Sequence, residues 1–215
     1  MQLQIAMDCM QSIEDFQNLG DRVEQSIDIL DVGTPMLMNF GLAPVELLGR
    51  TCRKRGRKVL ADTKIMDAGY YEARMAIEAG ADIVTVLGAA EDITIRQAVK
   101  AARELGAEVM VDMIAVPQVE KRIPEVEEMG VSYICLHHSK DRQAEKGGFQ
   151  CYFERLRSKA AGSRLAVAGG ICRENISYFA GMKPEIVIVG EGICKAEDPS
   201  GSAAYIKGML NEVTA

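Results

Sequence analysis

A short segment, Asp62-Thr-Lys-Ile-Met-Asp67, has the residue types and spacing best suited to chemistry in this chain. It follows the apolar run Lys58–Ala61. In an extended strand, residues two apart point the same way, so Asp62 and Lys64 are expected to face a common side. The carboxylate then keeps the lysine protonated, and Asp67 can close an acid–base–acid chain from the following loop. Such an array suits stabilisation of a developing oxyanion; a structural ion pair is the alternative.

The two histidines of the chain are adjacent, His137 and His138, directly after the apolar run Ser132–Leu136. Neighbouring residues of a strand point to opposite sides, so only one of the two rings can face the chemistry. Because an imidazole titrates near neutral pH, His137 is the better candidate for a general acid or base. Lys140 can place positive charge over an anionic substrate. A histidine with purely structural partners and a solvated lysine are the alternatives.

The elements that position these residues are eight short apolar runs separated by amphipathic stretches. Most of the runs are continuously apolar, which is typical of parallel strands buried on both faces. Between them, Asp92–Leu105 carries one apolar stripe at helical spacing. The ends of the runs, near positions 8 and 190, give a mean spacing of (190 − 8)/7 = 26 residues. We therefore predict a single (β/α)8 barrel domain, α/β class, over residues 1–215, with a doubly wound sheet as the alternative. The expected strands are Leu3–Met7, Ile27–Val32, Lys58–Ala61, Ile83–Leu87, Glu108–Val111, Ser132–Leu136, Leu165–Ala168 and Ile186–Val189.

Polar residues follow these runs at the same end each time, which is the end where such barrels carry their active sites. The last two runs end in paired glycines, which let backbone N–H groups approach a ligand closely. Barrels of this kind often bind phosphate at these two loops. We therefore expect a phosphate site there, with tight turns as the alternative and with Glu191 turned away. The residues expected around one mouth are Asp8, Asp31, Asp62, Lys64, Asp112, His137, Gly169, Gly170, Gly190 and Gly192.

Composition excludes several classes of protein. There are 25 Lys and Arg against 31 Asp and Glu, a net charge of −6, which argues against a general nucleic-acid or membrane-surface binder. No apolar run approaches the length of a membrane span, and the first residues lack the pattern of a signal peptide. The six cysteines form no C-x-x-C pair, so we expect reduced thiols in a cytoplasmic protein. The basic run Arg50–Lys58 is expected to be a solvated face away from the chemistry.

Four segments of the chain resemble 3-hexulose-6-phosphate synthase, a family grouped with 3-keto-L-gulonate-6-phosphate decarboxylase and orotidine-phosphate decarboxylase. The segments are Ala61–Gly69, Ala81–Gly88, Val111–Val116 and Val167–Ile171. The resemblance runs from Leu3 to about Lys207. The D-x-K-x-x-D motif marks the group, and by itself it does not separate the members.

The resemblance implies a homodimeric barrel with shared active sites and a metal-stabilised 1,2-enediolate, usually with Mg²⁺. By this resemblance, Asp31 and Asp62 would hold the metal, and Lys64 would stabilise the enediolate. His137 would move protons, and Asp67 would complete the site of the partner subunit. The implied substrate-binding residues are Asp8 on the floor, Asp112 at the side, Lys140, and the phosphate-cradling Gly169, Gly170, Gly190 and Gly192.

Two departures from the family pattern bear on the activity. The family normally has glutamate where this chain has Asp31, one methylene shorter. The synthases usually have His-x-Gly-x-Asp where this chain reads His137-His-Ser-Lys-Asp141, which is closer to the decarboxylase. The segments Ala81–Gly88, Val111–Val116 and Val167–Ile171 favour the synthase. Glu191 stands where the decarboxylase has arginine. The resemblance therefore favours condensation of D-ribulose 5-phosphate with formaldehyde; the decarboxylase and a non-catalytic phosphate-binding barrel are the alternatives.

Overall fold

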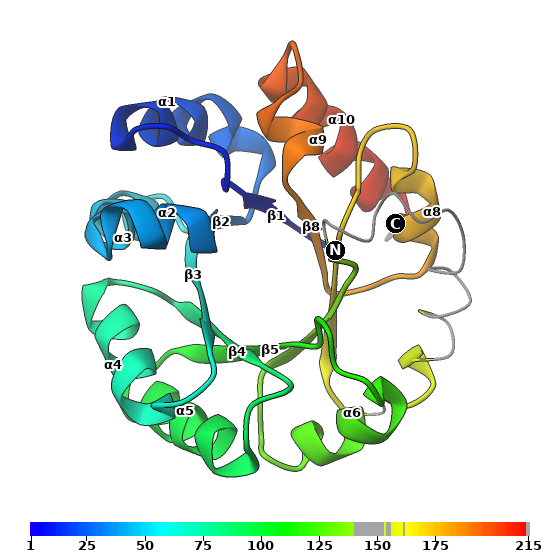
Figure 1. The fold of residues 1–215 in the computed structure, drawn as a ribbon. Coiled ribbons are helices and arrows are strands. Elements are labelled where there is room, and N and C mark those ends of the chain that lie inside the picture. Colours follow the sequence, from blue (N-terminus) through cyan, green and yellow to red (C-terminus); the bar gives the residue numbers. More distant parts are fainter. Residues whose placement is uncertain (140–152, 154–155, 161, 214–215) are drawn as a thin grey trace.

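Eight parallel strands close into a barrel in sequence order, β1 to β8, as the computed structural model shows (Figure 1). The structure describes residues 1–139, 153, 156–160 and 162–213. The (β/α)8 fold class predicted from the spacing of apolar runs is confirmed, and the alternative open sheet is wrong because β1 also pairs with β8. The strands are β1 Gln2–Ala6, β2 Ile29–Val32, β3 Lys58–Ile65, β4 Ile83–Leu87, β5 Glu108–Asp112, β6 Tyr133–His137, β7 Arg164–Ala168 and β8 Ile186–Val189.

Helices surround the barrel and cover the outer face of its strands (Figure 1). The helix expected over Asp92–Leu105 has those bounds and ends at Gly106, whose φ of 73° suits a residue without a side chain. Among the described residues the helices are α1 Ile13–Val23, the 3-10 turn η1 Glu24–Ser26, α2 Thr34–Phe40, α3 Ala43–Lys54, α4 Gly69–Ala79, α5 Asp92–Leu105, α6 Val119–Glu127, α8 Ile176–Gly181, α9 Glu191–Cys194 and α10 Pro199–Glu212.

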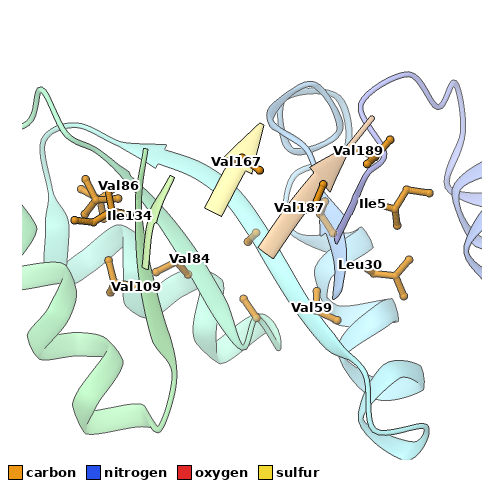
Figure 2. Packing of buried hydrophobic residues seen from close by; sticks show 14 of the residues in the cluster. Ile5, Leu30, Val59, Val84, Val86, Val109, Ile134, Val167, Val187 and Val189 are labelled. Carbon is orange, nitrogen blue, oxygen red and sulfur yellow. The ribbon is translucent and has the colours of Figure 1, made fainter. Parts of the chain in front are cut away.

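Each strand is buried on both faces, which explains its continuous run of apolar residues. One set of side chains packs outward against the helices, including Ile5, Leu30 and Val109 (Figure 2). The alternate set fills the inside of the barrel, including Leu60 and Met110. The core is thus two concentric apolar layers, and a polar side chain within either layer needs a specific partner.

The amino-terminal end of the barrel is filled by a charged cluster. Glu108 at the start of β5 accepts hydrogen bonds from Lys58 and Arg164. The Arg164 guanidinium also lies 4.0 Å from the centre of the Tyr133 ring. These contacts join four strands at the amino-terminal end of the barrel, whereas the expected site lies at the carboxyl end. Arg55 of the basic run pairs with two acids of α1 and η1 near the same end.

Seven of the eight expected strands agree with the structure to within two residues at each end. The exception is β3, which was expected to end at Ala61 and continues to Ile65. Five cysteines lie in the described part of the chain, and all five are free thiols, as expected; Cys52 and Cys135 are buried. No helix in the described ranges combines the length and apolar character needed to cross a membrane.

Candidate active site

Four polar side chains form one continuous chain of contacts at the carboxyl end of the barrel. Lys64 Nζ lies 2.6 Å from Asp62 Oδ2 and 3.2 Å from Asp112 Oδ2. The same Asp112 oxygen lies 2.9 Å from Nδ1 of His137. Strands β3, β5 and β6 therefore bring together the lysine, the histidine and two of the acids expected from the sequence. The acid–base–acid arrangement exists as Asp62–Lys64–Asp112.

Among the described residues, no hydrogen bond or ion pair joins the Asp67 side chain to this cluster, in which Asp112 is the second acid. The role of Asp67 in the site of a partner subunit stays a prediction. Because β3 continues to Ile65, the chain leaves the barrel mouth only after that residue. The turn that follows is fixed by Thr94, whose hydroxyl donates to the Asp67 carbonyl at 3.0 Å. The Asp67 side chain is exposed to solvent.

Lys64 is held as an ammonium ion. Burial alone would lower the pKa of its amine, but the charges of Asp62 and Asp112 outweigh burial and raise the pKa above its usual value. The side chain is about a quarter exposed, at 26%, so it faces the mouth as well as its partners. A fixed cation at this position is suited to stabilising an oxyanion on a bound substrate.

Asp112 links the lysine to the histidine and is 3% exposed. Burial would raise the pKa of its carboxyl group, but His137, Lys64 and the backbone N–H of Ile114 together lower it. An ionised carboxylate can only accept hydrogen bonds, so Nδ1 of His137 must donate to it. In a neutral ring this leaves the lone pair on Nε2, the state that a general base requires. Asp112 thus orients His137 in addition to lining the side of the site.

Asp31 of β2 is buried in the same region, at 4% exposure. Burial, Asp62 and Asp8 raise the pKa of its carboxyl group well above the usual value. Gln4 Nε2 donates to Asp31 Oδ2 at 2.8 Å, while Asp31 Oδ1 is buried without a hydrogen-bond partner. The described residues contain no group of three candidate metal ligands. Mg²⁺ commonly uses only one or two protein carboxylates and fills its other positions with water and substrate, so the unpartnered oxygen of Asp31 beside Asp62 fits such an ion.

Asp8, which the resemblance places on the floor of the site, is close enough to Asp31 to raise the pKa of that carboxyl group. Its side chain is exposed and lies directly against the backbone of Gly33, where an added Cβ would meet Asp8 Oδ1 at 1.7 Å. The glycine at position 33 therefore makes room for this carboxylate. Asp31 and Asp112, by contrast, are buried.

The two glycine loops lie against each other at the same end of the barrel. Gly169 and Gly170 have φ angles of 112° and 66°, which disfavour other residues. A Cβ on Gly192 would meet the carbonyl oxygen of Ile171 at 2.4 Å, so the loop after β8 touches the loop after β7. Gly190 has no such close contact. Glu191 pairs with Lys195 at 2.6 Å, consistent with the expectation that it turns away.

Lys140 lies outside the described residues. Three polar residues that the sequence analysis did not single out lie next to the site: Gln4, Thr34 and Thr85. Thr34 Oγ1 lies 2.9 Å from Asp62 Oδ2 and donates to the Asp62 carbonyl at 2.8 Å. Gln4 interrupts the apolar run Leu3–Met7 and Thr85 interrupts the apolar strand β4, which is the signal that could have identified them.

A closed parallel barrel with a lysine, a histidine and carboxylates at its carboxyl mouth defines an enzyme of the (β/α)8-barrel class. The chain belongs to the orotidine 5'-phosphate decarboxylase / HUMPS family, whose family model matches residues 1–206. It is 40% identical over 214 residues to 3-hexulose-6-phosphate synthase 2 of Staphylococcus saprophyticus, covering 100% of this chain and 99% of the relative.

Solved structures give the same relationship. The 3-hexulose-6-phosphate synthase from Salmonella typhimurium superposes with a TM-score of 0.94 at 35% identity, covering 99% of this chain and 100% of that chain. A KGPDC from Streptococcus mutans, solved with a bound ligand, superposes with a TM-score of 0.90 at 25% identity, covering 100% and 99% of the two chains. The resemblance to this family is confirmed, and the chain is an enzyme of the carbon–carbon lyase class.

Proposed function

We propose that this enzyme condenses D-ribulose 5-phosphate with formaldehyde to give a 3-hexulose 6-phosphate, reversibly. The observation that carries the proposal is the Lys64 ammonium fixed between Asp62 and Asp112, with His137 on the same Asp112 oxygen. A base next to a fixed cation is what formation and stabilisation of an enediolate require. The names of the relatives in Staphylococcus saprophyticus and Salmonella typhimurium support the same reaction.

His137 removes a proton from C1 of the pentulose phosphate through Nε2, and the electron pair forms the 1,2-enediolate. The ammonium group of Lys64 stabilises the negative charge on the enediolate oxygens. C1 then attacks the carbonyl carbon of formaldehyde, a new carbon–carbon bond forms, and the formaldehyde oxygen takes up the proton. Asp112 keeps His137 in the required orientation throughout.

Mg²⁺ is part of this proposal, and Asp31 and Asp62 are the residues that would hold it. The unpartnered buried Oδ1 of Asp31 supports this assignment. When bound, the ion supplies additional positive charge beside the sugar oxygens. The glycine loops at Gly169–Gly170 and Gly190–Gly192 would take the phosphate group, since their close contact leaves backbone rather than side chains at that part of the mouth.

A homodimer with shared active sites is also proposed. Large apolar side chains are exposed on α2, on the loop after β3, and on α4 and α5, next to the exposed Asp67. An apolar surface of this kind marks an interaction site, and a second copy placed there would receive Asp67 in its own site. Sedimentation of the protein tests the dimer, and a monomer with full activity would contradict it. The exposed residues are Met38, Met66, Tyr71, Met75 and Ile93.

The competing activity is decarboxylation of 3-keto-L-gulonate 6-phosphate, which passes through the same enediolate. The similarity to KGPDC from Streptococcus mutans favours it, at lower identity. The two reactions are separated by incubating the protein with each substrate and Mg²⁺. Formaldehyde uptake that depends on ribulose 5-phosphate supports the synthase, and release of carbon dioxide without formaldehyde uptake supports the decarboxylase.

A phosphate-binding barrel without catalytic activity is the third hypothesis. Lys64→Ala and His137→Ala separate it from both enzymes, because each variant should abolish turnover in either reaction. Wild-type protein without turnover, or variants with unchanged turnover, would support the non-catalytic phosphate-binding barrel. Location in the cytoplasm belongs to the same proposal, and the free thiols of the described cysteines are the state that a reducing compartment maintains.

A further inference from the structure

Strand β3 is irregular at the point where it carries the reactive residues. The pairing of β3 with β4 runs Leu60 to Ile83 and Ala61 to Val84, and resumes only at Ile65 with Val86. Four residues of β3 therefore advance against two of β4. Within this bulge, Lys64 has a φ of 46°, in the left-handed region that non-glycine residues rarely adopt. Such a conformation persists only where surrounding contacts determine it.

Thr85 is the β4 residue opposite the bulge, and it supplies those contacts. Its hydroxyl donates to Asp62 Oδ1 at 2.7 Å and accepts the backbone N–H of Lys64 at 2.9 Å. Its carbonyl oxygen accepts from the hydroxyl of Thr63 at 2.8 Å. The side chain is buried, with 3% of the residue exposed. One hydroxyl group thus replaces the missing ladder bond and fixes a carboxylate at the same time.

We propose that Thr85 is a positioning residue for the reaction, which orients the Asp62 carboxylate and holds the strained backbone of Lys64 through a single hydroxyl group. The contact with Asp62 turns Oδ1 toward Thr85 and leaves Oδ2 to pair with Lys64. The contact with the Lys64 N–H directs the ammonium group toward both acids. This role rests on the proposed function, because it is the enediolate that needs the ammonium in that place.

The decisive variant is Thr85→Val, which keeps the shape of the side chain and removes its donor and acceptor. It leaves the Lys64 N–H and Asp62 Oδ1 without this partner, so we expect kcat to fall about ten- to a hundredfold. The KM for ribulose 5-phosphate should change by less than about threefold, because Thr85 lies on the opposite side of the mouth from the glycine loops. Thr85→Ser keeps the hydroxyl and should restore kcat to within about threefold of wild type.

A matched control comes from the next residue of the same strand. Val86 is buried in the outer apolar layer of the core, away from the layer that fills the barrel. Val86→Ala should lower the midpoint of thermal unfolding at least as much as Thr85→Val while keeping kcat within about threefold. Equal losses of kcat in both variants, or an unchanged kcat in folded Thr85→Val protein, would overturn the inference.

Amide hydrogen exchange at Lys64 gives a readout that does not depend on turnover. Thr85 protects this N–H in the wild type, so exchange should become at least about tenfold faster in Thr85→Val and stay slow in Thr85→Ser. If the wild-type protein turns over neither substrate, the proposed function fails and this measurement alone decides. Unchanged exchange in Thr85→Val would then refute the positioning role, and the expected acceleration would support it.

Discussion

Replacing Asp112 by asparagine should separate the orientation of the site from its ability to bind substrate. Asp112 Oδ2 accepts from both His137 and Lys64, and each of these is a hydrogen bond to a charged group. Such bonds contribute about 1.5–3 kcal/mol each, or about 3–6 kcal/mol for the two. At about 1.4 kcal/mol per factor of ten, kcat should fall by about 10² to 10⁴.

The assay is steady-state formaldehyde uptake with ribulose 5-phosphate, with KM expected to change less than about fivefold. The matched control is Glu108→Gln, because Glu108 lies on the same strand, faces the barrel interior and is also paired with cations. It sits at the other end of β5, so the control should lower stability and keep kcat. A kcat for Asp112→Asn close to that of wild type, or an equal loss in Glu108→Gln, would refute the reasoning.

Three further predictions concern stability and the metal. Burial would raise the pKa of Glu108, but its cationic partners outweigh burial and lower the pKa from 4.5. The stabilisation of the native state by Glu108 is therefore present above pH 4.5 and is lost as the pH falls through the lower pKa of the folded protein. Glu108→Gln should therefore flatten the acid limb of urea-unfolding free energies, and an unchanged limb would contradict this. Gly169→Ala should lower the free energy of unfolding by about 1–3 kcal/mol, because Gly169 has a φ of 112° and lies against His138. Gly208→Ala, where the added methyl group meets open space, should be neutral or stabilising by about 0.5–1 kcal/mol. Equal effects of the two variants on thermal unfolding would argue against strain at Gly169. Chelation by EDTA should abolish turnover and Mg²⁺ restore it, and Asp31→Asn should raise the half-saturating Mg²⁺ concentration by at least about tenfold; an Mg²⁺ titration that superposes on that of wild type would exclude Asp31 as a ligand.

The barrel could be predicted because burial on both faces leaves a strong pattern, an apolar run about every 26 residues. The mouth could be predicted for a related reason, since a polar residue that follows such a run in a parallel barrel lies at one rim. Asp31, Asp62, Asp112 and His137 were found in this way. The contact between Asp62 and Lys64 was also predicted, although the extended strand expected for it is a bulge with Lys64 at a φ of 46°.

The remaining features depend on geometry that apolar periodicity does not encode. A bulge adds residues to one strand without changing their types, so the expected end of β3 lies four residues before the observed one. For the same reason Asp112, and not Asp67, is the second acid of the cluster within one chain. The role of Asp112 as the acceptor for both cations follows from the packing of three strands. Gln4 and Thr85 were absorbed into apolar runs, and only their buried partners show why a polar residue is tolerated there.

The crowding of acids around Asp31 has a consequence for the whole molecule. Loss of hydration, together with repulsion from Asp62 and Asp8, opposes the charged form of this buried group, so the gathering of acids that the proposed metal site needs also weakens the native state. Molecules that neutralise the excess charge will bind the native state in preference to the unfolded chain. The resistance of this enzyme to heat and to proteolysis should therefore increase with the concentration of such ligands and be lowest in their absence.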